Sequence, residues 1–261
     1  MAYRFILFEV DQGVARITLN RPDVLNSIHT DMSGEIQEAL ARATREREIR
    51  AVLLTGTGRG FCAGQDLDEV RPGSSAGDFA DHVRTVYNPL VRGLRMLEKP
   101  VVCAVNGVAA GAGANLALAC DLVIAAEEAS FVQSFAKIGL VPDTGGSFFL
   151  PQLVGMARAT ALAMLAEKIT ARQAVEIGLI YRACPAATLQ EESTTLAVHL
   201  AAQPTLGLGL TKRLLNSAGA NGLDAQLALE AELQGEAGRS ADYVEGVTAF
   251  LAKRKPVFTG R

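Results

Sequence analysis

Two glycine-rich loops constrain this chain more than any other feature of its sequence. The first loop spans residues 58–67 and follows the apolar run AVLLT at 51–55, and the second spans 106–115 and follows VVCAV at 101–105. Short apolar runs without alternation are typical of strands that are covered on both faces of a sheet. The second loop leads into a helical pattern, so backbone N–H groups at the start of that helix should be free to bind negative charge.

Neither loop matches a nucleotide-binding motif. Gly111 and Gly113 are followed by Leu116 where the dinucleotide fingerprint requires a third glycine, and the chain has no Gly-Lys-Ser/Thr sequence of a phosphate-binding loop. Close packing of a helix on a sheet also uses glycines, and for either loop taken alone this structural explanation stays open. The presence of two such loops in one chain favours a binding site.

A third loop, GLVPDTGGS at residues 139–147, carries an acidic residue just before a glycine pair. An aspartate ahead of a helix is a common N-cap, and a carboxylate in a loop can also act as a catalytic base, so both interpretations of Asp143 stay open at this point. Ser147 is not predicted to be a nucleophile, because Phe149 replaces the second glycine of a nucleophile elbow.

The cysteines and histidines do not have the spacing of a metal site. No two cysteines form a Cys-x-x-Cys pair, and no histidine belongs to a His-Glu-x-x-His motif. We expect buried thiols in a reducing compartment, histidines on the surface or on helix faces, and no bound metal. The residues concerned are Cys62, Cys103, Cys120, Cys184, His29, His82 and His199.

Charge and hydropathy argue against nucleic acid or a membrane as a partner. The formal net charge is −3 and the sequence pI is about 5.7, whereas a nucleic-acid-binding protein normally carries a basic face. The apolar segment 101–126 contains Asn106, Asn115 and Asp121, so it is predicted as strand, loop, helix and strand rather than as a membrane span. Residues 1–10 lack the pattern of a signal peptide, and a cytoplasmic location is expected.

Periodicity predicts an α/β body followed by a mainly helical C-terminal part. A helix at 31–48 has Thr30 as its expected N-cap, a long loop occupies 56–77, and a second helix spans 78–97. Strands are expected at 3–10, 14–20, 51–55, 101–105 and 122–126, with a short extended segment at 131–137. Further helices are expected at 144–153, 155–166, 171–177, 189–202, 205–217, 223–237 and 241–252.

Taken together, several motifs resemble the crotonase, or enoyl-CoA hydratase/isomerase, superfamily. They are LNRP at 19–22, FCAGQDL at 61–67, NGVAAGAG at 106–113, GLVPD at 139–143 and FLAKR at 250–254. The resemblance spans nearly the whole chain and implies an α/β fold built as a spiral of β-β-α turns. It also implies a catalytic core over residues 1–200, a helical oligomerisation region over 201–261, and a homotrimer or a hexamer made of two trimers.

The resemblance further implies an acyl-CoA thioester as the substrate and a set of residues that bind it. The thioester oxygen would accept hydrogen bonds from the backbone N–H groups of Ala63 and Ala112, which form an oxyanion hole. CoA is part of the substrate, so no separate cofactor is implied. Phe250 and Lys253 match positions that reach the CoA of a neighbouring subunit. The other residues expected to contact substrate are Leu25, Gln65, Asp66, Leu67, Asn115 and Phe135.

One departure from the family pattern bears directly on the chemistry. Hydratases of this family use two glutamates to add water, and here those positions are Asn115 and Phe135, neither of which can act as a base. Asp143 is therefore the expected catalytic carboxylate, and classical hydration is not expected.

Finer similarities point to one branch of the family. The stretches GFCAGQDL at 60–67, YNPLV at 87–91, VPDTGG at 141–146 and AGRSADY at 237–243 resemble the branch that converts the ring epoxide of phenylacetyl-CoA to an oxepin in phenylacetate catabolism. Alternatives within the family are a Δ3-Δ2-enoyl-CoA isomerase and an enoyl-CoA hydratase with a relocated base. An alternative from another class is a non-catalytic RNA-binding or scaffold relative, which the acidic balance disfavours.

Overall fold

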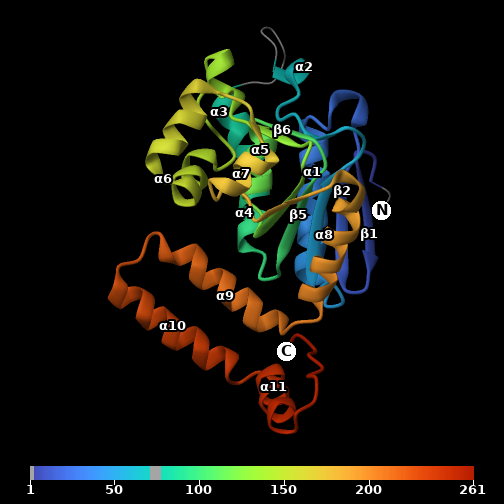
Figure 1. Ribbon diagram of the computed structural model, residues 1–261, viewed down its shortest axis with the longest axis vertical. Coiled ribbons are helices and arrows are strands. Elements are labelled where there is room, and N and C mark those ends of the chain that lie inside the picture. Colours follow the sequence, from blue (N-terminus) through green and yellow to red (C-terminus); the bar gives the residue numbers. More distant parts are fainter. Residues whose placement is uncertain (1–2, 71–77) are drawn as a thin grey trace.

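The strands of this chain alternate between two sheets. The computed structural model describes residues 3–70 and 78–261 (Figure 1). The larger sheet has the order β1-β2-β3-β5-β7-β10 and the smaller sheet the order β4-β6-β8-β9. The strands are β1 (Ile6–Asp11), β2 (Val14–Leu19), β3 (Ala51–Gly56), β4 (Gly60–Cys62), β5 (Val101–Val105), β6 (Val108–Ala110), β7 (Leu122–Ala126), β8 (Ser130–Val132), β9 (Ile169–Thr170) and β10 (Arg182–Cys184).

Consecutive strands form pairs whose members join different sheets. β3, β5 and β7 are parallel neighbours in the larger sheet, and the strands that follow them, β4, β6 and β8, are parallel neighbours in the smaller one. Helical structure separates each pair from the next. The predicted α/β spiral of β-β-α turns is therefore confirmed. Because β3 and β5 are parallel, the two glycine loops leave the larger sheet at the same edge.

The apolar runs singled out in the sequence form the centre of the molecule. β5 is buried along its whole length, and β3 and β7 are buried at all but their end residues. Helix α8 (Ala186–Ala201) packs across the larger sheet, and α1 (Thr30–Arg45) covers the β1–β2 hairpin (Figure 1). The two glycine loops are therefore attached to buried strands. Movement of these strands would disrupt the packing of the core.

The remaining elements follow the predicted ranges with local corrections, one of which is that the predicted loop 56–77 contains β4 and a short helix at Leu67–Val70. The N-cap of α1 is His29 rather than Thr30, because Met32 N donates to His29 Nδ1 at 3.1 Å. The segment 131–137 is extended only through β8 and then forms the 3-10 helix η3 (Ser134–Ile138). Part of the predicted loop, residues 71–77, lies outside the described residues. Other short elements are η1 (Pro22–Val24), α2 (Leu67–Val70), α5 (Ala112–Leu118) and α7 (Ala171–Glu176).

The predicted helix 78–97 contains a π turn. It consists of α3 (Phe79–His82), the π-helical segment η2 (Val83–Tyr87) and α4 (Asn88–Met96). At the end of η2, Asn88 N donates to Val83 O, five residues earlier in the chain. Single π turns inside α-helices are rare and are found frequently at functional sites.

Helix α6 (Gly146–Leu165) is long and apolar enough to cross a membrane, and within the described residues it is the one helix that meets this criterion. Gly155, however, has φ 75° and ψ 161°, so the helical hydrogen bonding is interrupted there. Each half is shorter than the roughly 20 residues that span a bilayer. The break matches the predicted pair of helices at 144–153 and 155–166. The segment 101–126 contains β5, α5 and β7 as predicted, and the loop predicted between β5 and α5 also contains the strand β6.

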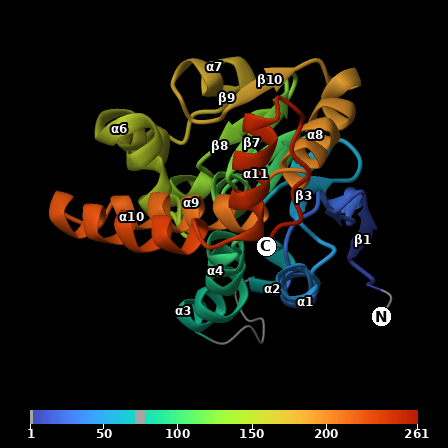
Figure 2. The ribbon, with the colours of Figure 1, turned by 90° about the horizontal axis from the view of Figure 1, so that it is seen from below.

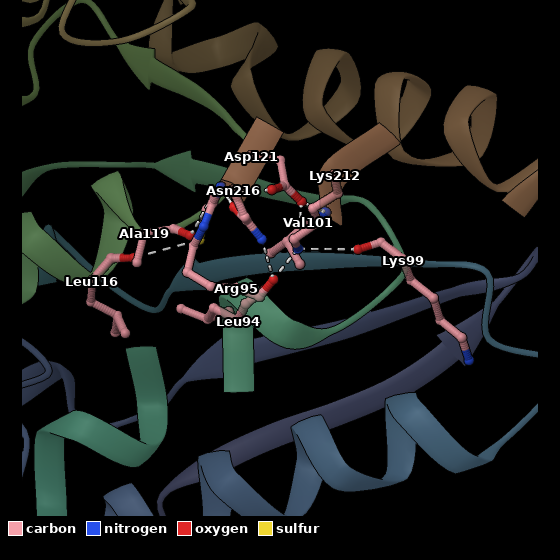
Figure 3. A network of polar contacts seen from close by, with 10 residues as sticks. Leu94, Arg95, Lys99, Val101, Leu116, Ala119, Asp121, Lys212 and Asn216 are labelled. Atoms are coloured by element: carbon pink, nitrogen blue, oxygen red, sulfur yellow. Dashed lines mark hydrogen bonds and ion pairs between the residues drawn. The ribbon is translucent and has the colours of Figure 1, made fainter. Parts of the chain in front are cut away.

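Three helices at the C-terminal end extend away from the sheets: α9 (Thr205–Ala218), α10 (Leu223–Ala237) and α11 (Ala241–Leu251) (Figures 1 and 2). A charged network fixes α9 to the body. Lys212 Nζ lies 2.8 Å from Asp121 Oδ2 and donates to Leu94 O at 2.7 Å, and Arg95 Nη1 lies 3.2 Å from Asp121 Oδ1 (Figure 3). Arg95 also hydrogen-bonds to Asn216 on α9.

Replacing Lys212 with methionine should lower the free energy of unfolding by about 2 kcal/mol. The variant keeps the buried stem but removes the donor to Leu94 O, and it leaves Asp121 with Arg95 and Val101 N only. Urea denaturation measures the effect, with the exposed Lys255 changed to methionine as a matched control. Equal stability of the two variants would contradict this role of the network.

Exposed apolar side chains gather on α6, α10 and α11, outside the sheets. Such a surface is typical of a face that another protein surface covers. The assignment of residues 201–261 to oligomerisation, as a trimer or a hexamer, stays a prediction that these side chains favour. They are Leu153, Met156, Met164, Leu165, Leu223, Leu227, Tyr243, Val244, Val247, Phe250 and Leu251.

Candidate active site

The two glycine loops touch each other where β4 and β6 end. A Cβ atom added at Gly64 would lie 2.7 Å from Ala110 O and 3.3 Å from Ala112 N, and one added at Gly113 would overlap the carbonyl oxygen of Cys62. Only glycine leaves room for this contact. The second loop then becomes the first turn of α5, so the sequence places the start of a helix directly against the first loop.

The backbone N–H groups of Gln65 and Ala112, one from each loop, make no backbone hydrogen bond in the described part of the chain. Ala112 is the first residue of α5, where an N–H has no partner within the helix. Gly64 O accepts from Ile28 N, and Asp66 N donates to Ile28 O. Since successive residues of an extended segment face opposite sides, the intervening Gln65 N–H points away from Ile28.

The prediction that Ala63 offers a free N–H is wrong. Ala63 N donates to Leu25 O at 2.9 Å, which ties the first glycine loop to the turn after η1. Leu25 adopts a left-handed conformation there, with φ 52° and ψ 38°. The hydrogen bond between Ala63 and Leu25 decides which N–H groups of the first loop remain free. The N–H groups of Gln65 and Ala112 are therefore the candidate donors, one from each loop, and the role expected for Ala112 stays a prediction.

Asp143 is not the N-cap of α6. That position belongs to Gly145, and the Asp143 carboxylate accepts instead from Thr144 Oγ1 at 2.8 Å. The side chain is half-buried, and burial raises the pKa of the Asp143 carboxyl, an effect that Thr144 and the nearby His82 partly offset. A carboxylate with a raised pKa is closer to the range in which a general base works at neutral pH.

Asn115 fixes the backbone of Asp143. Its Nδ2 donates to Asp143 O at 2.9 Å, and its Oδ1 accepts from Gln133 Nε2 at 2.8 Å. The carbonyl of Asp143 can only accept, so it determines the orientation of both amides in this chain. Gly146 leaves the space that the Asn115 side chain fills. Asn115 is fully buried and cannot take up a proton. It stands where the hydratases have one of their glutamates, and in this chain it holds the Asp143 loop in place.

Phe135 occupies the second hydratase position and lies beside the same loop. A Cβ atom at Gly111, the residue before Ala112, would be 3.7 Å from the Phe135 ring. Phe135 and Phe61 are buried, and they make the surroundings of the junction apolar. Apolar surroundings strengthen hydrogen bonds to a charged oxygen and disfavour water.

Sequence reasoning missed two residues of this region, His82 and Tyr87. His82 lies on a helix face, which was one of the two expected positions, but that face is buried and the side chain is 6% exposed. His82 Nε2 lies 2.7 Å from Gln65 Oε1, and the Tyr87 hydroxyl donates to the same oxygen at 2.6 Å. These two bonds hold α3 and η2 against the first glycine loop. The sequence analysis did not predict the π turn, and without it His82 and Tyr87 are not expected to lie on the same face of the helix.

The other predicted substrate residues divide into two groups. Leu25, Gln65, Asp66 and Leu67 lie together at the first loop, where Asp66 forms an ion pair with Arg21 at 2.8 Å. Leu67 is 59% exposed. By contrast, Phe250 and Lys253 lie in and after α11, at the opposite end of the molecule (Figure 1). A single chain does not bring this second group to the site, so their contact with a neighbouring subunit's CoA stays a prediction.

The thiols near the site are neutral. All four cysteines are buried and free, as expected, and burial raises the pKa of the Cys62 thiol to about 12. A thiol with such a pKa carries almost no thiolate at neutral pH and is a poor nucleophile. Across residues 3–70 and 78–261, no cluster of three or more His, Cys, Asp or Glu side chains could hold a metal ion.

A model of the enoyl-CoA hydratase/isomerase family matches residues 9–261. The chain belongs to this family. Among relatives in the family, the 1,2-epoxyphenylacetyl-CoA isomerase of Escherichia coli (strain K12) is 55% identical over 98% of this chain and 99% of its own. A probable enoyl-CoA hydratase of Rhodobacter capsulatus is 49% identical over all of both chains. The crystal structure of a putative enoyl-CoA hydratase from Streptomyces coelicolor A3(2) matches with a TM-score of 0.94 and 38% identity, covering 100% of this chain and 96% of that one.

Proposed function

We propose that this family member is an acyl-CoA isomerase that converts a ring-epoxidised phenylacetyl-CoA to an oxepin-CoA in phenylacetate catabolism. The observation that carries the proposal is the combination of the Asp143 carboxylate, which forms no ion pair within the described residues, with the N–H groups of Gln65 and Ala112 at the loop junction. Asp66, by comparison, is paired with Arg21, and Glu69 accepts from Thr30 N. The name of the Escherichia coli relative supports the choice of substrate.

In this mechanism the thioester oxygen accepts hydrogen bonds from Gln65 N and Ala112 N. Negative charge that develops on that oxygen is stabilised by fixed dipoles, at about 3 kcal/mol for each donor. Asp143 removes a proton from the carbon next to the thioester carbonyl. The bond between the two ring carbons that share the epoxide oxygen breaks, the ring expands to seven members, and the carboxyl returns the proton to a ring carbon. No atom is gained or lost, and no metal, redox cofactor or water takes part.

A second candidate is a double-bond shift in an unsaturated acyl-CoA. One carboxylate and one oxyanion hole suffice for a 1,3-proton shift, because the same group takes and returns the proton. Hydration, which the name of the Rhodobacter capsulatus relative describes, finds less support. Asn115 holds a backbone carbonyl and Phe135 is apolar, so neither can activate water.

Incubation of the purified protein with a panel of acyl-CoA thioesters tests the proposal. We expect conversion of the ring epoxide, identified by mass spectrometry and ultraviolet absorbance, and negligible hydration of crotonyl-CoA. A robust hydratase rate would contradict the assignment of Asn115 and Phe135. The same proposal includes a homotrimer or hexamer in the cytoplasm. It includes no cofactor other than the CoA of the substrate, and no nucleic-acid or membrane partner.

Asn115→Asp should lower kcat by roughly 5- to 150-fold, because loss of the Nδ2 donor leaves Asp143 O facing a carboxylate. The kinetics of epoxide conversion measure the effect, and the half-buried Asn221→Asp, whose Nδ2 donates to Gln226 Oε1 instead, is the matched control. A kcat equal to that of the unaltered protein would show that Asn115 does not hold the Asp143 loop.

Asp143→Asn should also stabilise the fold at neutral pH. The pKa of Asp143 is higher in the folded chain than the value of about 3.9 in an unfolded one. The folded state therefore binds the proton more tightly, and stability is lost as pH rises from about 4 through the raised pKa. Urea denaturation at several pH values should show the variant more stable at pH 7, with the difference vanishing at low pH. A constant difference would contradict the raised pKa.

A further inference from the structure

The side chain of Gln65 is held at one oxygen by two buried donors. The Tyr87 hydroxyl donates to Gln65 Oε1 at 2.6 Å, and His82 Nε2 lies 2.7 Å from the same atom. Tyr87 is only 1% exposed. An amide oxygen accepts two hydrogen bonds, so both acceptor sites are occupied. The Nε2 of Gln65 donates to Asp66 O at 3.0 Å, which fixes the other end of the amide.

The protonation states of these groups are determined by their partners. Burial above all, with the nearby Cys62 and Asp143, raises the pKa of the Tyr87 hydroxyl well above its ordinary value, so it stays a donor. Because Gln65 Oε1 can only accept, His82 must carry a hydrogen on Nε2. The neutral tautomer with Nε2–H and the imidazolium both satisfy this condition, so the contact does not depend on the charge of His82.

The π turn η2 explains how two residues five apart reach one atom. In a regular α-helix, residues i and i+5 point in directions about 140° apart around the axis. Hydrogen bonding from i to i+5, as between Asn88 N and Val83 O, brings such residues above one another. His82 and Tyr87 therefore share a face, and that face meets Gln65.

We propose that Tyr87 and His82 are positioning residues which, by holding the side chain of Gln65, fix the direction of its backbone N–H as an oxyanion donor. This inference rests on the proposed function, in which the Gln65 N–H binds the thioester oxygen. The backbone before Gln65 is Gly64, with φ 93°, and glycine restrains its neighbours little. Hydrogen bonds to Ile28 hold the backbone at Gly64 O and Asp66 N, and the side-chain anchor adds a restraint at Gln65 itself.

The proposal makes a kinetic prediction that a purely structural role does not make. Displacement of a catalytic group by about 1 Å can cost on the order of 10²-fold in rate. We therefore expect the double variant Tyr87→Phe, His82→Leu to lose about 10²-fold in kcat with KM little changed. His82→Gln, which retains an N–H near the position of Nε2, should keep most of the activity that His82→Leu loses. Exposed Tyr181→Phe is the matched control.

Infrared spectra of bound [1-¹³C]phenylacetyl-CoA, a thioester without the epoxide, measure the oxyanion hole without turnover. The carbonyl band should move to lower frequency on binding to the unaltered protein, and this shift should shrink in the double variant. Thermal unfolding shows whether the variant is folded. If it is not, Tyr87→Phe, which removes a single oxygen atom, takes its place.

The possible outcomes separate the two proposals. A shifted band in the unaltered protein, together with the same shift and the same kcat in the folded variant, overturns the positioning role and leaves the oxyanion hole intact. Absence of a shift in the unaltered protein overturns the oxyanion hole and the positioning role with it. A reduced shift together with a reduced kcat supports both.

Discussion

Replacement of Asp143 by asparagine should lower the rate of epoxide isomerisation by about 10²- to 10⁴-fold. Asparagine has nearly the same size, and its Oδ1 can still accept the hydrogen bond from Thr144 Oγ1. The backbone contacts of residue 143 with Asn115 and Gly146 are also unaffected. What is lost is the ability to take a proton from the carbon next to the thioester. Acyl-CoA affinity should therefore stay close to that of the unaltered protein.

Steady-state kinetics and calorimetric titration with an acyl-CoA separate these two effects. The exposed Asp224 on α10, changed to asparagine, is a matched control that removes one carboxylate from the C-terminal helices. Near-normal turnover in Asp143→Asn would exclude Asp143 as the base. Simultaneous loss of binding and turnover would instead indicate a structural role.

Gly64→Ala should reduce turnover by about 10²-fold and also destabilise the fold. The new methyl group would lie 2.7 Å from Ala110 O and 3.3 Å from Ala112 N, so the loops must separate and the free N–H groups of Gln65 and Ala112 move apart. The positive φ of residue 64 adds a backbone cost of about 1–2 kcal/mol.

Gly139→Ala provides the control for the backbone cost. Gly139 also has a positive φ, 74°, but nothing lies within 4 Å of the added Cβ. Both variants should lose similar stability from the backbone conformation, and only Gly64→Ala should lose most of its activity. Kinetics and urea denaturation on the two proteins make the comparison. Equal activities would contradict the claim that contact between the two loops assembles the site.

Much of the fold could be predicted because its signals are local. The runs at 51–55, 101–105 and 122–126 are apolar without alternation, and each forms a central strand. The helix predicted at 223–237 has those limits in the structure. The π turn within 78–97 left no comparable signal, since a change from i→i+4 to i→i+5 bonding follows from what the helix packs against.

The site was predictable in part for the same reason. The motifs singled out Ala112, Asn115, Phe135 and Asp143, and the structure places these residues at or beside the loop junction. The motifs could not show which N–H group of the first loop is free, because this depends on the hydrogen bond from Ala63 N to Leu25 O. The burial of His82 could not be predicted, because its partner Gln65 lies 17 residues earlier in the chain.

A crystal structure of Asp143→Asn with the ring epoxide of phenylacetyl-CoA bound would test the central claim most directly. The thioester oxygen should lie within about 3 Å of both Gln65 N and Ala112 N, and residue 143 should face the carbon next to the thioester carbonyl. A thioester oxygen bound away from the loop junction, or residue 143 turned toward solvent, would contradict the account.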